Sequence, residues 1–220
     1  MIKKIINLSI YLLRYFSVIH TKYKISTEID FGSALSNDFF KKQLEKCKFY
    51  LEYGAGNSTL LANKLEKNYI SIEADKSFFN YLRNDRGISK LKYINLGPTK
   101  YFSYPIFPYI LIKKKINFYC NYINTFFIET KKIPDFILID GRFRSKTCLC
   151  IISFLLKERV KDEIVIIIDD YEQRENYKMI EKIVDVNKIG RFGVIKSDNF
   201  ANLSKEKLED LISKSAKDEL

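Results

Sequence analysis

The stretch YLEYGAGNSTLLA, Tyr50 to Ala62, runs from a β-type sequence through two glycines into a leucine-rich helical pattern. Glycine permits tight turns and close backbone approaches that other residues resist. A junction of strand, glycine turn and helix also brings unpaired N–H groups and the positive end of the helix dipole to one point. We therefore expect a ligand site at this turn.

Two kinds of element alternate on either side of the turn. Five β-type runs stand between turn residues, and helical patterns follow most of them. The β-type runs are KFYLEY (48–53), YISIEA (69–74), KYINLG (92–97), DFILID (135–140) and EIVIIID (163–169). The helical patterns are NSTLLANKLEK (57–67), KSFFNYLRNDR (76–86), RSKTCLCIISFLLKER (144–159) and YEQRENYKMIEKIVDV (171–186).

The fourth and fifth β-type runs are almost continuously apolar, as strands covered on both faces must be. Buried strands that alternate with helices predict an α/β fold: a Rossmann-like, doubly wound, mostly parallel sheet with helices on both faces. Ligands of such folds bind at the carboxyl ends of the strands. The candidate positions are therefore Glu52, Glu73, Gly97, Asp140 and the pair Asp169 and Asp170.

The 220 residues, 46% of them hydrophobic, suffice for one sizeable core, which we assign to residues 48–197. Residues 98–132 form a Pro-, Tyr- and Lys-rich insertion before the fourth strand, of a length that is usually functional in a compact domain. Residues 1–47 are expected to form a helical cap across the sheet, and residues 198–220 a charged C-terminal helix.

The net charge of +11 would suit an anionic partner, but the lysines are scattered among Ile, Asn, Tyr and Phe. No arginine-rich stripe or known binding motif accompanies them, which disfavours nucleic acid as a partner. Four cysteines without CxxC spacing are typical of buried, reduced thiols in a cytoplasmic protein. The single histidine, His20, lies near the N-terminus, which argues against a Ser-His-Asp triad and against a multi-histidine metal site.

The two ends of the chain resemble targeting signals. Residues 1–20 begin basic and continue apolar, but polar residues interrupt them and no A-x-A-like site follows. We expect an amphipathic helix that packs on the domain or makes peripheral contact with a membrane. The final Lys217-Asp218-Glu219-Leu220 matches an endoplasmic-reticulum retention signal, and we interpret it as the accidental end of a charged helix.

Three ligand classes use a glycine turn of this kind: P-loop nucleotides, dinucleotides and S-adenosylmethionine. No Gly-Lys-Ser/Thr follows Gly56, and Thr59 stands where a dinucleotide site needs its third glycine. Glu52, at the end of the strand, would repel a pyrophosphate but suits a cofactor that carries an ammonium and a sulfonium. Ser58 and Thr59 could cap the helix and also reach a bound carboxylate.

An acidic residue followed by x-Gly-x-Gly after a first strand is similar to the first motif of class I S-adenosylmethionine-dependent methyltransferases. The resemblance covers roughly residues 46–197 and continues at Glu73, about twenty residues after the first acid. It implies S-adenosylmethionine as the cofactor. Its methionine half would contact Glu52 and the loop Gly54, Ala55 and Gly56, with Ser58 and Thr59 near its carboxylate, and its ribose hydroxyls would bind Glu73.

The motifs IDGRFR (139–144) and DDY (169–171) resemble those of a narrower group of bacterial methyltransferase-like proteins associated with surface-glycan pathways. Methyl transfer is an in-line displacement, so an enzyme must align the acceptor and remove its proton. Asp140 and Asp170 are the candidate bases, and pairing with the nearby arginines or capping of the following helices is the structural alternative. The candidates for binding the acceptor are Arg142, Arg144 and Tyr171, with Tyr101, Tyr104 and Tyr109 as an aromatic wall.

Asp140, Asp169 and Asp170 could also imitate the Mg²⁺ site of catechol-type methyltransferases, but we predict no metal because strand-end carboxylates have commoner uses. The predicted function is O-methylation of a small molecule or glycan precursor. Two alternatives stay open: a non-catalytic binding module with a methyltransferase fold, and an NAD-dependent sugar-modifying enzyme.

Overall fold

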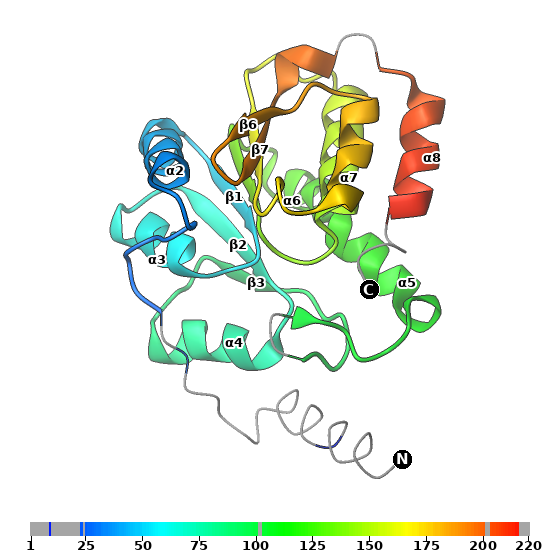
Figure 1. Cartoon of the computed structure of the whole chain (residues 1–220). Coiled ribbons are helices and arrows are strands. Elements are labelled where there is room, and N and C mark those ends of the chain that lie inside the picture. Colours follow the sequence, from blue (N-terminus) through cyan, green and yellow to red (C-terminus); the bar gives the residue numbers. More distant parts are fainter. Residues whose placement is uncertain (1–8, 10–22, 24, 101–102, 201–202, 216–220) are drawn as a thin grey trace.

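The computed structural model in Figure 1 describes residues 9, 23, 25–100, 103–200 and 203–215. Within them, seven strands form one sheet in the order β3-β2-β1-β4-β5-β7-β6. Strands β1 to β5 are parallel to one another, and β7 is antiparallel to both β5 and β6. The strands are β1 (Tyr50–Tyr53), β2 (Tyr69–Glu73), β3 (Leu91–Tyr93), β4 (Phe136–Ile139), β5 (Val165–Ile168), β6 (Asn187–Ile189) and β7 (Phe192–Lys196). The predicted α/β fold is confirmed.

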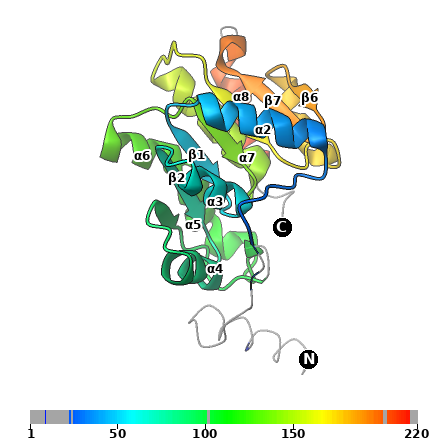
Figure 2. The same ribbon diagram turned by 90° about the vertical axis from the view of Figure 1, so that its left-hand side faces the viewer.

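Helices cover both faces of the sheet (Figures 1 and 2). Along β4, Ile137 and Ile139 belong to one apolar cluster, whereas Phe136 and Leu138 belong to the other. The first cluster includes α5 (Tyr109–Cys120), α6 (Tyr122–Thr130), α7 (Arg144–Lys157) and α8 (Lys205–Ser215). The second includes α2 (Ala34–Lys46) and α3 (Asn57–Lys64). All four residues of β4 are buried, which explains the continuously apolar sequence.

A smaller apolar cluster lies at the start of the connection between β2 and β3. Helix α4 (Lys76–Asn80) continues into a π-helical turn, η1 (Tyr81–Asp85). Leu82 in this turn packs against Leu60 of α3 and Ile88. The N-terminal segment joins the cluster through Ile25, and the ring of Tyr23 lies 4.8 Å from that of Phe78.

The insertion 98–132 is largely helical. Residues 109–130 form α5 and α6, whose buried side chains include Ile112, Ile116, Ile123 and Phe126. Spacings of three and four residues place such side chains on one face of a helix. The segment is therefore mostly the crossover between β3 and β4, and it supplies core residues.

The predicted helix over residues 171–186 is wrong in large part. Only a 3₁₀ helix, η3 (Glu175–Lys182), forms there, and a β6–β7 hairpin follows that the sequence analysis did not predict. Gly190 adopts φ +58° in the turn of this hairpin, a conformation that favours glycine. A second 3₁₀ segment, η4 (Ser197–Phe200), precedes α8.

The structure describes little of the two terminal segments for which the sequence analysis made predictions. The predicted helix within residues 1–20 lies outside the described residues except for Ser9, as do Tyr101 and the final Lys-Asp-Glu-Leu. Among the described residues, none of the helices is long and apolar enough to cross a membrane. The four cysteines are buried thiols outside any disulfide, as predicted.

Candidate active site at the carboxyl ends of the strands

The glycine turn after β1 has one closed side and one open side. Gly54 adopts φ +93°, and a Cβ atom there would lie only 2.6 Å from the backbone N of Gly141, so the turn is tightly packed against the loop after β4. Gly56 is extended, with φ −175°, and a Cβ atom there would meet no atom of the residues that the structure describes within 4 Å. The space above Gly56, at the start of α3, is where a ligand could approach the backbone.

Glu52 lies beneath this turn and is fully buried. Its carboxylate accepts hydrogen bonds from four hydroxyl groups. The donors are Ser58 Oγ, Ser71 Oγ, Thr59 Oγ1 at 2.5 Å and Tyr50 OH at 3.1 Å. Burial raises the pKa of Glu52, and these hydrogen bonds oppose the increase.

This arrangement changes the roles expected of three residues. The hydroxyls of Ser58 and Thr59 donate to Glu52, so neither is directed at a bound carboxylate. Thr59 Oγ1 also accepts a 2.9 Å hydrogen bond from the N–H of Gly56, which secures the helix start. Glu52 has no exposed surface, and its observed contacts make it the anchor of the turn. Direct contact between Glu52 and a cofactor stays a prediction, and it would require these hydroxyls to move.

Glu73 ends the neighbouring strand β2 and is 4% exposed. Its Oε1 atom accepts hydrogen bonds from the N–H groups of Ala74 (2.7 Å) and Asp75 (2.6 Å) and from Ser103 Oγ (2.7 Å). Its Oε2 atom accepts none from the described residues. Burial raises the pKa of Glu73 to about 7, against the opposing effect of these donors. One oxygen of this carboxylate is therefore held rigidly while the other can serve a ligand.

The N-terminal segment reaches the same turn. Asn57, the first residue of α3, accepts a hydrogen bond from the N–H of Ser26 (3.1 Å) and donates one to the carbonyl of Glu28 (2.9 Å). Ala55 contributes to the small apolar cluster that also contains Ile25. The chain before α2 thus lies against the candidate ligand turn.

The acids after β4 and β5 form an ion-pair network with arginines. Arg144, at the start of α7, lies 2.7 Å from Asp140 Oδ1 and 3.0 Å from Asp170 Oδ2. Arg191, from the β6–β7 turn, binds both oxygens of Asp169 at 2.7 and 2.6 Å and Asp170 Oδ1 at 2.6 Å. Arg144 also donates to the backbone carbonyls of Asp140, Gly141 and Asp169. Its side chain is only 11% exposed, so Arg144 holds the ends of β4 and β5 together and leaves little surface for an acceptor.

Of the two candidate bases, Asp140 is the more exposed. The exposed fraction of its side chain is 32%, against 19% for Asp170. Burial and the neighbouring carboxylates of Asp169 and Asp170 raise the pKa of Asp140, while Arg144 lowers it. Asp170 is paired with three arginines, Arg144, Arg191 and, at 3.8 Å, Arg174, and it adopts φ +57°. No group of three or more acidic, histidine or cysteine side chains among the described residues is arranged to hold a metal ion.

The two remaining candidates for binding the acceptor, Tyr171 and Arg142, differ in their exposure. Tyr171 does not fit its predicted role, because it is 1% exposed, its ring packs over Gly193 and its hydroxyl donates to Glu181 Oε1 at 3.1 Å. It is a core residue with almost no surface for a substrate. Arg142 instead stacks on the ring of Tyr104, 3.6 Å from the ring centroid, and its guanidinium lowers the pKa of that tyrosine. Tyr104 is 37% exposed, so this pair presents both a cation and an aromatic surface.

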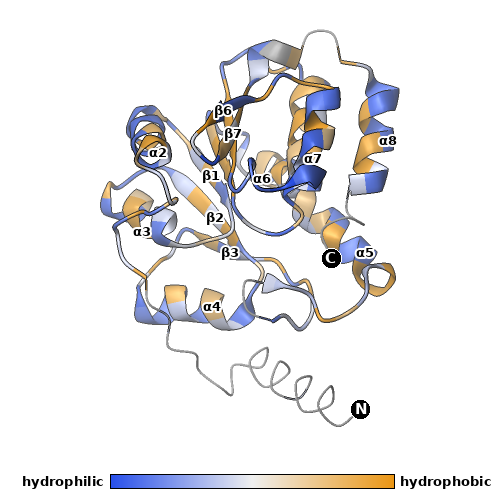
Figure 3. Cartoon of the chain, viewed as in Figure 1, coloured by the Kyte–Doolittle hydropathy of each residue, from blue (hydrophilic) through white to orange (hydrophobic). Residues whose placement is uncertain are grey.

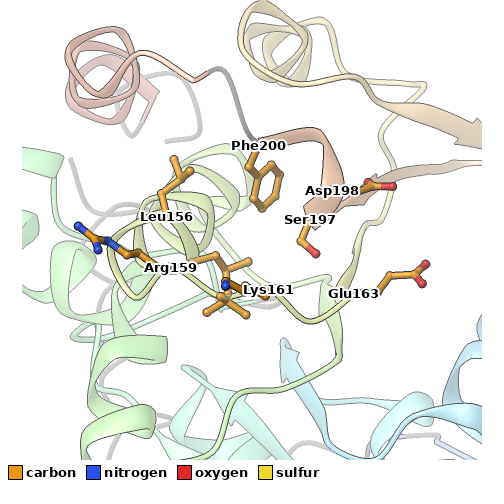
Figure 4. Close-up of a pocket in the computed structure, with 9 residues that line it drawn as sticks. Leu156, Arg159, Lys161, Glu163, Ser197, Asp198 and Phe200 are labelled. Atoms are coloured by element: carbon orange, nitrogen blue, oxygen red, sulfur yellow. The ribbon is translucent and has the colours of Figure 1, made fainter.

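A separate cavity of about 470 Å³ lies at the opposite end of the strands, where β5 begins and β7 ends (Figure 4). Its walls come from the end of α7, the loop before β5 and the segment after β7. Arg159, Lys161, Glu163 and Asp198 place charges of both signs around it. None of the predicted site residues lines this cavity, so it is distinct from the candidate active site.

Some site residues were missed by the sequence analysis. Ser71 lies beside Glu52 in the β1–β2 register, and a serine in the middle of an apolar strand was the available signal. Arg191 could have been noticed because Gly190-Arg191 separates two β-type runs, as in a hairpin. Ser103 carries no sequence signal that points to Glu73, thirty residues earlier.

Comparison with solved structures finds a similar fold in a methyltransferase-like protein from Silicibacter pomeroyi DSS-3. The two chains are 22% identical, with a TM-score of 0.67, and the match covers 86% of this chain and 97% of that one. No protein-family model matches the chain, and neither does any curated protein. At this identity the likeness shows the fold alone, which is that of a methyltransferase-like protein.

Proposed function

We propose that this chain is an S-adenosylmethionine-dependent methyltransferase that acts on oxygen of a small molecule or glycan precursor. The observation that carries the proposal is the open turn at Gly56, with a buried carboxylate behind it and a second one, Glu73, at the end of the next strand. A helix start alone attracts phosphate, whereas the negative charge of Glu52 behind α3 offsets that attraction. This combination favours a cofactor with a ribose and a cationic end over one with a pyrophosphate.

The residues present fit such a cofactor. Oε2 of Glu73 would accept a hydrogen bond from a ribose hydroxyl, and the N–H groups in the first turn of α3 would bind the carboxylate of the methionine half. An added Cβ atom at Gly56 would meet no atom of the described residues within 4 Å, which supports a ligand close to this backbone. S-adenosylmethionine supplies the methyl group when it is bound.

The acceptor would lie beside the loop after β4. Asp140, one-third exposed and with a raised pKa, is the proposed base for the acceptor hydroxyl proton. Arg142 and Tyr104, which stack on each other, would together border the acceptor, the first as a partner for a carboxylate or phosphate and the second as an apolar surface. An anionic sugar offers both an acidic group for Arg142 and an apolar ring face for Tyr104.

Calorimetric titration tests the cofactor assignment. We expect the wild-type chain to bind S-adenosylmethionine and S-adenosylhomocysteine, and Glu73→Ala to bind each of them at least about tenfold more weakly, the loss of one hydrogen bond to a charged group. The same protein titrated with NAD should give no heat of binding. Binding of NAD, or unchanged binding of S-adenosylmethionine by Glu73→Ala, would overturn the proposal.

A second candidate, a binding module with this fold, is favoured by the ion-pair network. Asp140 and Asp170 both contact Arg144, which lowers their availability as bases. Incubation with methyl-labelled S-adenosylmethionine and fractionated cell extract separates the two. Transfer of label that Asp140→Asn abolishes supports the enzyme, whereas cofactor binding without transfer in any fraction supports the module.

A further inference from the structure

Helix α5 presents an apolar surface to the solvent. Its buried side contains Ile112, Ile116 and Tyr119. On the opposite side Ile110 is 76% exposed, Leu111 69% and Phe118 50%, and Phe107, just before the helix, is 39% exposed. Figure 3 colours this helix in both hydrophobic and hydrophilic shades. Exposed aliphatic side chains gathered on one helix usually mark an interaction surface.

The same helix is strongly basic. Lys113, Lys114 and Lys115 are all exposed. Between Asp85 and Glu129 the chain contains seven Lys and Arg residues and no acidic residue at all. At a spacing of 100° per residue, Lys114 projects between Ile110 and Phe118, and the other two lysines flank the apolar side chains. We call Phe107, Ile110, Leu111, Phe118 and these three lysines the α5 face.

The α5 face lies next to the carboxyl ends of the parallel strands. A Cβ atom built on Gly97, shortly after β3, would lie 3.5 Å from the ring of Phe107 and 3.9 Å from Lys115 Nζ. Four residues before Phe107, Ser103 donates its hydrogen bond to Glu73. The segment that carries the exposed apolar residues therefore also borders the candidate active site.

We propose that the α5 face docks on the surface of a membrane that contains anionic lipids. The apolar side chains would enter the boundary between headgroups and acyl chains, while the lysine ammonium groups extend to the lipid phosphates. Each lysine near an anionic surface adds to the attraction. This docking does not depend on methyl transfer, and it would place the strand ends near acceptors that are carried in the membrane.

Other partners suit the α5 face less well. In a symmetric dimer built on this face, the lysines of one copy would meet the lysines of the other, and the sequence from 86 to 128 offers no acidic residue to pair with them. Nucleic acid would match the charge, but it offers no apolar environment for Ile110 and Leu111. A lipid surface matches both properties at once.

Vesicle co-sedimentation with the full chain tests the proposal. The vesicles contain phosphatidylcholine alone or phosphatidylcholine with one-third phosphatidylglycerol. We expect binding to the anionic vesicles only, weakened as NaCl rises from about 0.1 to 0.5 M. Ile110→Ser with Leu111→Ser, and separately Lys113→Glu with Lys114→Glu and Lys115→Glu, should each reduce partitioning about tenfold or more.

Matched controls come from α2, on the other face of the sheet. Leu35→Ser removes a leucine that is 60% exposed, and Lys41→Glu with Lys42→Glu and Lys46→Glu changes the net charge by the same amount. Both controls should bind the anionic vesicles as the wild type does. Equal losses in controls and α5 variants, or no binding by the wild type, would overturn the proposal. So would a dimer, seen by sedimentation velocity, that Ile110→Ser with Leu111→Ser converts to monomers.

Discussion

At the scale of single residues, two glycines of the YGAG turn have opposite requirements. Gly54 needs its positive φ and its close approach to Gly141, so any side chain there collides with backbone. Gly56 is extended, and an added Cβ atom would meet none of the described residues within 4 Å, so neither its backbone conformation nor its packing requires a glycine. A ligand that approaches the backbone would explain why glycine stands there.

The substitution Gly56→Leu should therefore leave the protein folded and block the cofactor. We expect a change of less than about 1 kcal/mol in the free energy of unfolding, and loss of S-adenosylmethionine binding in calorimetry. Gly54→Ala is the contrast: a Cβ atom 2.6 Å from backbone at φ +93° should cost several kcal/mol. Undiminished cofactor binding by Gly56→Leu would disprove the placement of the ligand.

Glu73 should make stability depend on pH. Its pKa is about 7 in the folded chain and 4.5 as the reference for the unfolded one, so the folded state holds an additional proton between these values. Its stabilising contribution is complete below pH 4.5 and is lost as pH rises through 7. The free energy of unfolding of wild type relative to Glu73→Gln should thus fall by about 3 kcal/mol from pH 4.5 to 7.5. Urea denaturation at several pH values measures this, and parallel profiles would contradict it.

At the scale of elements, the β6–β7 hairpin completes the candidate site. It brings Arg191 to Asp169, which is 1% exposed, and to Asp170. The hairpin thereby ties the antiparallel edge of the sheet to the end of β5. Without it, a buried carboxylate would keep only Arg144, 3.6 Å away, as a charged partner.

Replacing this arginine should reveal that dependence. Arg191→Met keeps much of the side-chain volume and removes the charge, and it should lower the free energy of unfolding by about 3 kcal/mol because Asp169 is left under-paired. Lys188→Met, in the exposed strand β6 of the same hairpin, should change it by less than about 0.5 kcal/mol. Equal effects of the two variants in urea denaturation would refute the argument.

At the scale of the whole molecule, the two faces of the sheet share the burial unequally. The face under α5 to α8 holds the larger apolar cluster, including Cys120, Cys148 and Cys150, and the face under α2 and α3 holds Cys47. Burial raises the pKa of Cys47 to about 11 and of Cys150 to about 12, and it raises that of Cys148 further. The reactivity of the four thiols therefore measures how well both faces of the sheet stay closed.

All four cysteines should resist a thiol reagent such as Ellman's reagent at pH 8 in the native protein and react together on unfolding. The physical reason is that buried thiols with raised pKa values form little thiolate and require opening of the core. Stopped-flow absorbance in increasing urea measures the rates. A fast phase from one cysteine in the absence of urea would show that its face opens separately.

The sequence by itself determined the α/β fold, the five parallel strands and the set of strand-end acids. Continuously apolar runs and a strand–glycine–helix junction are local patterns, and in a parallel sheet they lead to few topologies. They predicted that Glu52, Glu73, Asp140 and Asp170 lie together at the carboxyl ends of the strands.

Only the tertiary structure decided what those acids contact. Ser71, Ser103 and Arg191 reach them across 19 to 30 residues of sequence, and no local pattern encodes such pairings. The same long-range packing turned Arg144 into a link between strands and Tyr171 into core. Side-chain roles depend on which groups the fold brings within hydrogen-bond distance, whereas strands and helices depend mainly on the periodicity of neighbouring residues.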